Sequence, residues 1–555
     1  MDFVSSNLTS AFVLGTLLHL NVFKNIELES YIPKFFFAGI ISVTGLVYFY
    51  VAQTGLTVLA SATRVASETS CLIFGIFTSM TIYRLFFHRI RRFPGPLAAR
   101  VTRFYSLYLA SKNVQYHVEL EKLHKQYGDF VRTGPREIMI LRKSAVSIIL
   151  GVQPALLKTT WYSSISHKAD QVQLFASRDP LDHKRRRKAW DQAFSVKALS
   201  TYQPRIKSKV DLLMDNLLQT AGTPRDVTSW MMMLAFDVMG EIGFGNDFGG
   251  LATGKEHEAA QAIHKHMSII GTVGTVPWLL YLLQFIPGAG SGWAPFINWC
   301  GNMISQKKAA WDPEKYPQDI SSWLVKAVME KDISASPTEE SLRDDGRLII
   351  VAGSDTSASA NACTLFYLAK NPHTLQKLQS QLDAAMPEGL SSWSYDKALT
   401  VSYLDDIIKE SLRLKPPVIT GGYRLTPPEG LQVDEAWIPG GVNVFVPYQI
   451  LHTDVRYFAA PHDFVPERWS ERKKEMGTDE SLAIPFSAGI YKCPGDRVAM
   501  MSMRTTISCI AQTFDISFAS GETGDAFDTD RKDAFTTVLK PLNLVFTKRE
   551  KWANL

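Results

Sequence analysis

A cysteine near the C-terminus has surroundings in which a thiolate could bind a metal-centred cofactor. Cys493 lies in the run Phe486–Gly495 (FSAGIYKCPG), shortly before the helix-like stretch Arg497–Ile510. The positive end of a helix dipole lowers the pKa of a thiol, and glycines such as Gly489 let a flat cofactor approach the backbone. Thiolate is a known ligand of haem iron. Taken alone, a buried structural cysteine is the more ordinary explanation.

A second stretch could make room for a ligand inside a helix. Asp355 and Thr356 follow the apolar run Leu348–Gly353 and are predicted to lie mid-helix. A threonine hydroxyl there can bond back to the carbonyl four residues earlier, which belongs to Ala352, and such a bond bends the helix. The alternative is an Asp-Thr pair that only shapes a bent core helix.

Three charged residues could form a buried network. Glu410 and Arg413 are three residues apart and share one face of a predicted helix, and Arg468 could complete the set. Deleting one member of a buried network leaves an unpaired charge, which costs about 3–5 kcal/mol. The network would therefore be architectural. A surface ion pair is the alternative explanation.

Four stretches together resemble the motifs of the cytochrome P450 family. The cysteine run resembles the family's Phe-x-x-Gly-x-x-x-Cys-x-Gly loop, and 352–356 (AGSDT) resembles its oxygen-activation motif. The stretch 410–413 (ESLR) resembles its Glu-x-x-Arg motif, and 466–469 (PERW) its Pro-Glu-Arg-aromatic motif. The motifs stand in the family's order within residues 93–550. The resemblance, which is nearest to fungal secondary-metabolism members, implies a mainly α fold with small β-sheets that binds haem b.

The resemblance also implies roles for single residues. Cys493 would be the axial thiolate ligand of the iron, with Phe486 and Gly489 in the same cofactor-binding loop. Asp355 and Thr356 would steer protons to the reacting oxygen. The expected activity is insertion of one oxygen atom of O2 into a lipophilic molecule.

A basic run is predicted to reach the haem propionates. His183 and Arg187 stand at the places where the family has a propionate-binding pair, and Arg424 resembles a further propionate ligand. One position departs from the family. Tyr491, two residues before the cysteine, replaces the usual Arg or His, and a phenol brings no charge at neutral pH. We expect Arg424 to compensate.

The remaining basic residues of that run suggest a docking surface. Arg185, Arg186 and Lys188 are expected to face outward on the side of the cysteine ligand. Such a patch would suit an acidic flavoprotein, and the resemblance implies NADPH-cytochrome P450 reductase as electron donor, with cytochrome b5 as a further candidate.

The substrate pocket is expected to be apolar. By resemblance, four residues should line it: Val351, Ala352, Val418 and Thr420. The stretches 236–248 and 267–283 are candidate lids. A lipophilic secondary metabolite such as a terpenoid, alkaloid or polyketide would fit, and the sequence does not distinguish among these.

The elements that position this chemistry follow an apolar N-terminus. Residues 3–23, 35–63 and 69–83 carry no Asp, Glu, Lys or Arg, and about 20 apolar residues span a bilayer. The second stretch is predicted to span, whereas an interfacial helix is the alternative for the other two. Arg84 and the arginines after it place the following residues in the cytosol.

This pattern predicts three segments of the chain. Residues 1–92 form an anchor with one to three transmembrane helices, 93–96 (FPGP) a stiff tether, and 97–555 one catalytic domain. We expect an endoplasmic reticulum membrane protein with a cytosolic catalytic domain.

Composition excludes several other classes. The 59 basic and 54 acidic residues give a net charge of +5, which does not favour nucleic-acid binding, and five scattered cysteines exclude a disulfide scaffold. Two alternatives to a monooxygenase stay open: a haem-thiolate isomerase or dehydratase that does not use O2, and a non-enzymatic membrane haem protein.

Overall fold

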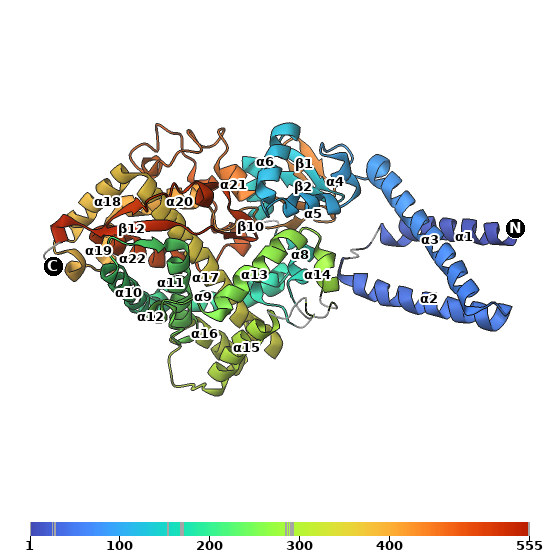
Figure 1. Ribbon diagram of the computed structural model, residues 1–555, viewed down its shortest axis with the longest axis horizontal. Coiled ribbons are helices and arrows are strands. Elements are labelled where there is room, and N and C mark those ends of the chain that lie inside the picture. The colour runs from blue at the N-terminus through green and yellow to red at the C-terminus, as the bar shows by residue number, and fades with distance from the viewer. Residues whose placement is uncertain are drawn as a thin grey trace.

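The chain forms a large helical body with a three-helix projection at its N-terminus (Figure 1). The computed structural model describes residues 2–24, 26, 29–152, 155–166, 171–283, 286, 288 and 293–552. Most of this chain is helical and the sheets are small, so the predicted fold class is confirmed.

The projection consists of α1 (Asp2–Leu18), α2 (Ile32–Thr54) and α3 (Val58–Ile82), and α3 continues as a π-helical turn to Phe87. The uncharged stretch 35–63 is therefore two helices rather than one span. Gly55, with φ +66°, ends α2, and the Thr57 side chain accepts a hydrogen bond from Ala60 N at the start of α3. Helix α3 thereby includes Arg64 and Glu68, which pair with each other at 3.2 Å.

Helix α1 packs closely against α3. A Cβ on Gly15 would lie 2.1 Å from Leu72 O, and a Cβ on Gly75 would lie 2.2 Å from Phe12 O. Beyond this crossing, His19 Nδ1 and Ser79 Oγ are 2.8 Å apart. Among the described residues, two helices are long and apolar enough to cross a membrane, Ile32–Thr54 and Val58–Phe87, while Asn7–Phe23 is apolar but shorter.

The body is organised around one long central helix. Helix α17 (Glu339–Lys370) packs against α11 (Val227–Phe244), α15 (Trp293–Ala309), α20 (Ser402–Leu414) and α22 (Asp496–Thr513). The longer helices around this core are α6 (Tyr116–Tyr127), α7 (Lys143–Leu150), α9 (Pro180–Ala193), α10 (Val196–Gln219), α13 (Glu258–Val273), α16 (Ile320–Met329) and α18 (Pro372–Ala385). The short helices are α4 (Leu97–Val101), α5 (Phe104–Ser111), α8 (Thr160–Ser164), α12 (Gly250–Thr253), α14 (Pro277–Leu283), α19 (Tyr395–Thr400), α21 (Tyr448–His452) and α23 (Asp525–Thr529).

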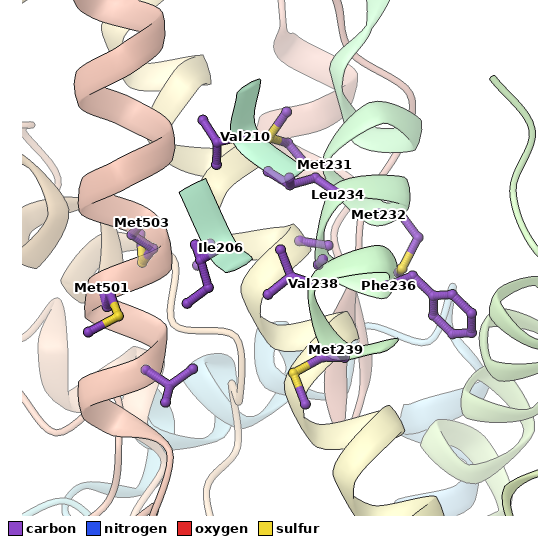
Figure 2. Close-up of a cluster of buried hydrophobic side chains, with 14 of the residues drawn as sticks. Ile206, Val210, Met231, Met232, Leu234, Phe236, Val238, Met239, Met501 and Met503 are labelled. Carbon is purple, nitrogen blue, oxygen red and sulfur yellow. The ribbon is translucent and has the colours of Figure 1, made fainter. Parts of the chain in front are cut away.

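Helix α11 belongs to the core and not to a lid. Figure 2 shows its residues Met231, Leu234 and Val238 together with Ile206 of α10 and Met503 of α22. The side chains of α11 from Met231 to Gly240 are buried. The prediction of a lid at 236–248 is therefore wrong for its helical part, because these side chains are packed on more than one face.

Four small sheets lie around the helices in the part of the chain that the structure describes. The largest has the order β1 (Phe130–Gly134), β2 (Glu137–Ile140), β8 (Asn443–Phe445), β5 (Arg424–Leu425), β3 (Leu157–Lys158). A second has the order β4 (Pro224–Asp226), β12 (Asn543–Lys548), β9 (Phe514–Phe518). The hairpins are β6 (Leu431–Val433) with β7 (Ala436–Ile438) and β10 (Lys532–Ala534) with β11 (Thr536–Val538).

The segment between projection and body is attached to the first sheet. Arg132 N on β1 donates to Pro94 O at 2.7 Å, and a Cβ on Gly95 (φ +155°) would lie 2.4 Å from Arg132 O. The Arg132 side chain is fully buried and donates to Arg84 O at the end of α3 and to Pro135 O. Residues 93–96 are therefore docked along β1.

Candidate active site

An apolar cavity of about 340 Å³ lies beside the central helix. The structure places Val351, Ala352 and Val418 on its wall. Thr420 is a correction: it does not line the cavity, and its hydroxyl donates to Asp533 instead. From the second proposed lid, Met267 and Ile270 of α13 line the cavity.

Cys493 presents its thiol to this cavity. The side chain is accessible from the cavity that it lines but lies away from bulk solvent, while Cys493 N donates to Phe486 O at 2.9 Å. Burial raises the pKa of the Cys493 thiol, and a backbone hydrogen bond to Gly495 together with Arg187 and Lys492 acts in the opposite direction. The expected lowering of this pKa is therefore not found in the protein alone. A bound metal ion would itself stabilise the thiolate.

Two residues of the cysteine run have different roles. Phe486 lines the cavity, whereas Gly489 is not among its lining residues. Gly489 has φ +67°, and a Cβ there would lie 1.9 Å from Leu150 O. This glycine is needed for close packing on the end of α7, and its role in cofactor binding stays a prediction.

Thr356 and Asp355 lie on different sides of α17. The Thr356 hydroxyl lines the cavity and donates to Ala352 O at 2.6 Å, which is the predicted back-bond. Asp355 is buried outside the cavity lining, with Oδ1 4.0 Å from His264 Nε2 of α13. Burial raises the pKa of Asp355, and the hydroxyl of Thr536 opposes this shift.

The network at Glu410 is complete and fully buried. Arg413 Nη2 and Arg468 Nε each lie 2.8 Å from Glu410 Oε1, and all three side chains are 0% exposed. A fourth member, Trp469, donates from Nε1 to Glu410 Oε2 at 3.1 Å. The sequence analysis missed Trp469, although it ends the PERW motif.

Basic side chains gather at another part of the cavity wall. Lys158, His183, Arg187 and Arg424 line it together with Tyr491. Lys158 and Arg424 stand directly opposite each other on the antiparallel strands β3 and β5. The Lys158 ammonium lies 4.4 Å from the centroid of the Tyr491 ring, and the Arg424 guanidinium lies 4.5 Å from it.

Comparisons with known proteins agree with this geometry. A model of the Cytochrome P450 family matches residues 94–546. The chain belongs to the cytochrome P450 family. It is 40% identical over 480 residues to the cytochrome P450 monooxygenase orf5 of Eupenicillium brefeldianum, covering 86% of this chain and 95% of that protein. It is 34% identical over 557 residues to the cytochrome P450 monooxygenase FCK2 of Fusarium pseudograminearum, covering 99% and 98%.

A third relative carries a reaction in its name. The chain is 28% identical over 552 residues to the tryprostatin B 6-hydroxylase of Aspergillus fumigatus, covering 98% of this chain and 96% of that protein. These relatives are fungal monooxygenases, so the P450 described here is a monooxygenase of the haem-thiolate class.

The charged side chains on the cavity wall indicate whether this P450 can hold the propionates of haem. Within the described ranges, Lys158 and Arg424 have no carboxylate partner, and both are only 2% exposed. Arg424 Nε and His183 Nδ1 also lack hydrogen-bond partners among the described residues. Burial lowers the pKa of Lys158 well below its usual range and that of His183 to about 2, and neighbouring cations add to both shifts. Such a wall needs an anion, and haem has two propionates. The residues therefore fit the cofactor.

Other charged residues of the P450 are placed differently from the prediction. Arg187 lines the cavity but donates to Lys492 O at 2.6 Å and to Asp191 at 2.7 Å. Arg186 was expected to face outward. It is 1% exposed and pairs with Asp345 at 2.9 Å.

The basic patch of this P450 is consequently smaller than predicted. Arg185 is partly buried and donates to Asp182 and to the carbonyl of Ala335. Lys184 and Lys188 of α9 stay exposed.

Proposed function

We propose that this P450 is a membrane-anchored monooxygenase that inserts one oxygen atom of O2 into a lipophilic secondary metabolite. The observation that supports it best is the Cys493 thiol facing a largely apolar internal cavity that the Thr356 hydroxyl also lines. Haem b bound there supplies the iron at which O2 is activated, and thiolate ligation favours O–O cleavage.

Each nearby side chain then has a distinct task. Cys493 holds the cofactor by its thiolate, and Arg424 and His183 face the propionates. Thr356 holds a proton at its hydroxyl, which the bond to Ala352 O orients on the cavity wall. Asp355 passes protons to this helix from the side of His264, whose ring is partly exposed.

The cavity wall supports a hydrophobic and flat substrate. Trp161 and Phe535 pack with ring centroids 4.9 Å apart, and Phe175 lies 5.3 Å from Phe535. All three line the cavity. Phe535 joins β10 to β11 with φ +72°, and this tight turn holds its ring on the cavity wall. An alkaloid, polyketide or terpenoid with a planar portion fits such a wall, and a relative named for hydroxylating tryprostatin B is consistent with it.

We also propose that the anchor crosses the endoplasmic reticulum membrane three times, with residues 97–555 as the cytosolic catalytic domain. Close packing through Gly15 and Gly75 supports α1 as a span, because glycines let helices associate in lipid. An N-terminal extension with an Asn-Gly-Thr acceptor should then be glycosylated in microsomes, and the same acceptor at the C-terminus should not. Glycosylation at the C-terminus alone would reverse the topology.

NADPH-cytochrome P450 reductase is proposed as the electron donor, with cytochrome b5 as an additional one. The exposed lysines Lys184 and Lys188 support docking of an acidic flavoprotein, with an effect on association rate and salt dependence. Product formation should require reductase and NADPH. Product formed without either would favour an isomerase or dehydratase.

The deciding experiment is the absorption difference spectrum of the reduced, CO-bound full chain in microsomes. Wild type should give a thiolate-type Soret band, and Cys493→Ala should lack it, because no sulfur ligand remains. Cys363→Ala is the matched control, since Cys363 is a buried cysteine of α17 outside the cavity lining. Full turnover by Cys493→Ala would reject the proposal.

A further inference from the structure

The cysteine run of this P450 has no cation at the position where the family resemblance led us to expect one. Tyr491 stands there, and its hydroxyl donates to Leu156 O at 3.3 Å rather than into the cavity. The His183 ring contacts the Tyr491 ring, with centroids 4.7 Å apart. A positive charge near this position must therefore come from another helix or strand.

Lys158 brings such a charge to the same place from a different strand. Its ammonium donates to Phe175 O at 2.7 Å and lies 4.4 Å from the centre of the Tyr491 ring. The backbone bond satisfies one of its three donors, and the ring face stabilises the cation. Neither interaction neutralises its charge.

The pairing of strands β3 and β5 brings Lys158 next to a second cation. Lys158 is registered opposite Arg424, and like charges directly opposed on neighbouring strands repel each other. Both side chains are buried on the cavity wall, and no carboxylate pairs with either in the described part of the chain. Two buried cations in register destabilise the protein unless they share an anion or Lys158 gives up its proton, and an anion on the cavity wall keeps both charges in place.

We propose that Lys158 is the cofactor-binding residue that replaces the missing cation of the cysteine run, holding a haem propionate jointly with Arg424. Tyr491 is then an aromatic support on which both cations pack. The proposal rests on the haem binding proposed above, and it deepens that function by assigning a residue that the sequence motifs do not contain.

The proposal reverses a simple expectation about Tyr491. Restoring the family's charge by Tyr491→Arg would seem to tighten haem binding. In this chain it places a third cation against Lys158 and Arg424, so it should weaken haem binding. The change should become favourable only when Lys158 loses its charge.

The test uses the full-length holoprotein and measures two properties besides activity. These are the rate of haem transfer to excess apomyoglobin and the reduction potential of the iron. The variants are Lys158→Met, Lys158→Arg, Tyr491→Arg and the double variant Lys158→Met/Tyr491→Arg. Lys255→Met is the control, because Lys255 is an exposed lysine outside the cavity lining.

Lys158→Met should lose haem about ten-fold faster or more, as expected for a lost charge-assisted bond. Its reduction potential should fall, because a positive charge near the cofactor is removed. Lys158→Arg should restore both values, and Lys255→Met should match wild type. Tyr491→Arg should lose haem faster than wild type, and the double variant more slowly than either single one.

Two results would overturn the proposal. One is Lys158→Met with wild-type haem transfer and reduction potential. The other applies if Lys158→Met yields no holoprotein. The double variant should then yield holoprotein, because Tyr491→Arg supplies the missing positive charge. If the double variant also yields none, the proposed role of the Lys158 charge is rejected. Absence of haem from the wild type would instead reject the proposed function itself.

Discussion

Two buried charge clusters of this P450 are built in opposite ways. Glu410 accepts from Arg413, Arg468 and Trp469, so one carboxylate meets two guanidinium groups inside the protein. Lys158 and Arg424 are as deeply buried, yet they face each other on the cavity wall without a described carboxylate between them. The first cluster finds its anion in the polypeptide, whereas we propose that the second finds its anion in the bound cofactor.

The difference separates architecture from binding. In the Glu410 network both guanidinium groups share an anion of the polypeptide, and their other N–H groups donate to backbone carbonyls, so its hydrogen bonds form with or without cofactor. Cations held apart from any acid instead destabilise the empty protein and favour the loaded one. Mutations in the two clusters should therefore respond differently to haem.

The largest expected effect is that of Glu410→Gln. The change leaves two fully buried guanidinium groups without their anion and should destabilise the protein by about 3–5 kcal/mol. Thermal unfolding and the yield of folded holoprotein measure it. Glu475→Gln is the control, because Glu475 pairs with Arg472 at an exposed site and should leave unfolding unchanged. A wild-type melting curve for Glu410→Gln would contradict the architectural role.

The next effect depends on whether haem is present. Arg424→Met should speed haem loss from the holoprotein but stabilise the haem-depleted protein. It removes hydrogen bonds to Tyr162 Oη and Tyr423 O, worth about 1 kcal/mol each, but also a buried unpaired charge that costs several kcal/mol. The free energy of unfolding, measured for the holoprotein and for the haem-depleted protein, shows whether the change destabilises the first and stabilises the second. Destabilisation of both forms alike would assign Arg424 to architecture.

A smaller effect should appear in catalysis alone. Thr356→Ala removes an uncharged hydroxyl from the cavity wall, so more reduced oxygen should escape as peroxide for each product formed while unfolding stays close to wild type. Thr364→Ala is the matched control, because Thr364 makes the same bond to the carbonyl four residues earlier, that of Ala360, outside the cavity lining. Equal coupling in both variants would reject the proton role of Thr356.

The smallest effect concerns the pH dependence of stability, to which the buried carboxyl group of Asp533 contributes. Burial raises the pKa of Asp533 to about 6, although Thr420 and Arg531 oppose the shift. A folded-state pKa above the unfolded value of about 3.9 means that the folded protein binds this proton first. The contribution of Asp533 to stability should therefore rise by about 1 kcal/mol from pH 7 to pH 5. Asp533→Asn should remove that rise, and an unchanged pH profile would contradict it.

The sequence predicts this molecule best where the chemistry is contained in short motifs. The Glu410 network was predicted because spacing and motif order identify its members, and the back-bond of Thr356 follows from its place in a helix. The burial of Arg186 was missed because its partner, Asp345, lies 159 residues away. Lys158 was missed for the same reason, since only strand pairing brings it to Arg424. The α2–α3 turn was missed because uncharged residues on both sides concealed Gly55 and Thr57.

Arg132 has a further consequence at the membrane. Its guanidinium holds carbonyls from the end of α3 and from the loop after β1, while its backbone holds Pro94. The connection between the projection and the body is therefore stiff. The three helices and the body should tilt together as one rigid unit. If the anchor crosses the membrane as proposed, the angle of its helices in the bilayer sets the height and direction at which Lys184 and Lys188 face the proposed reductase.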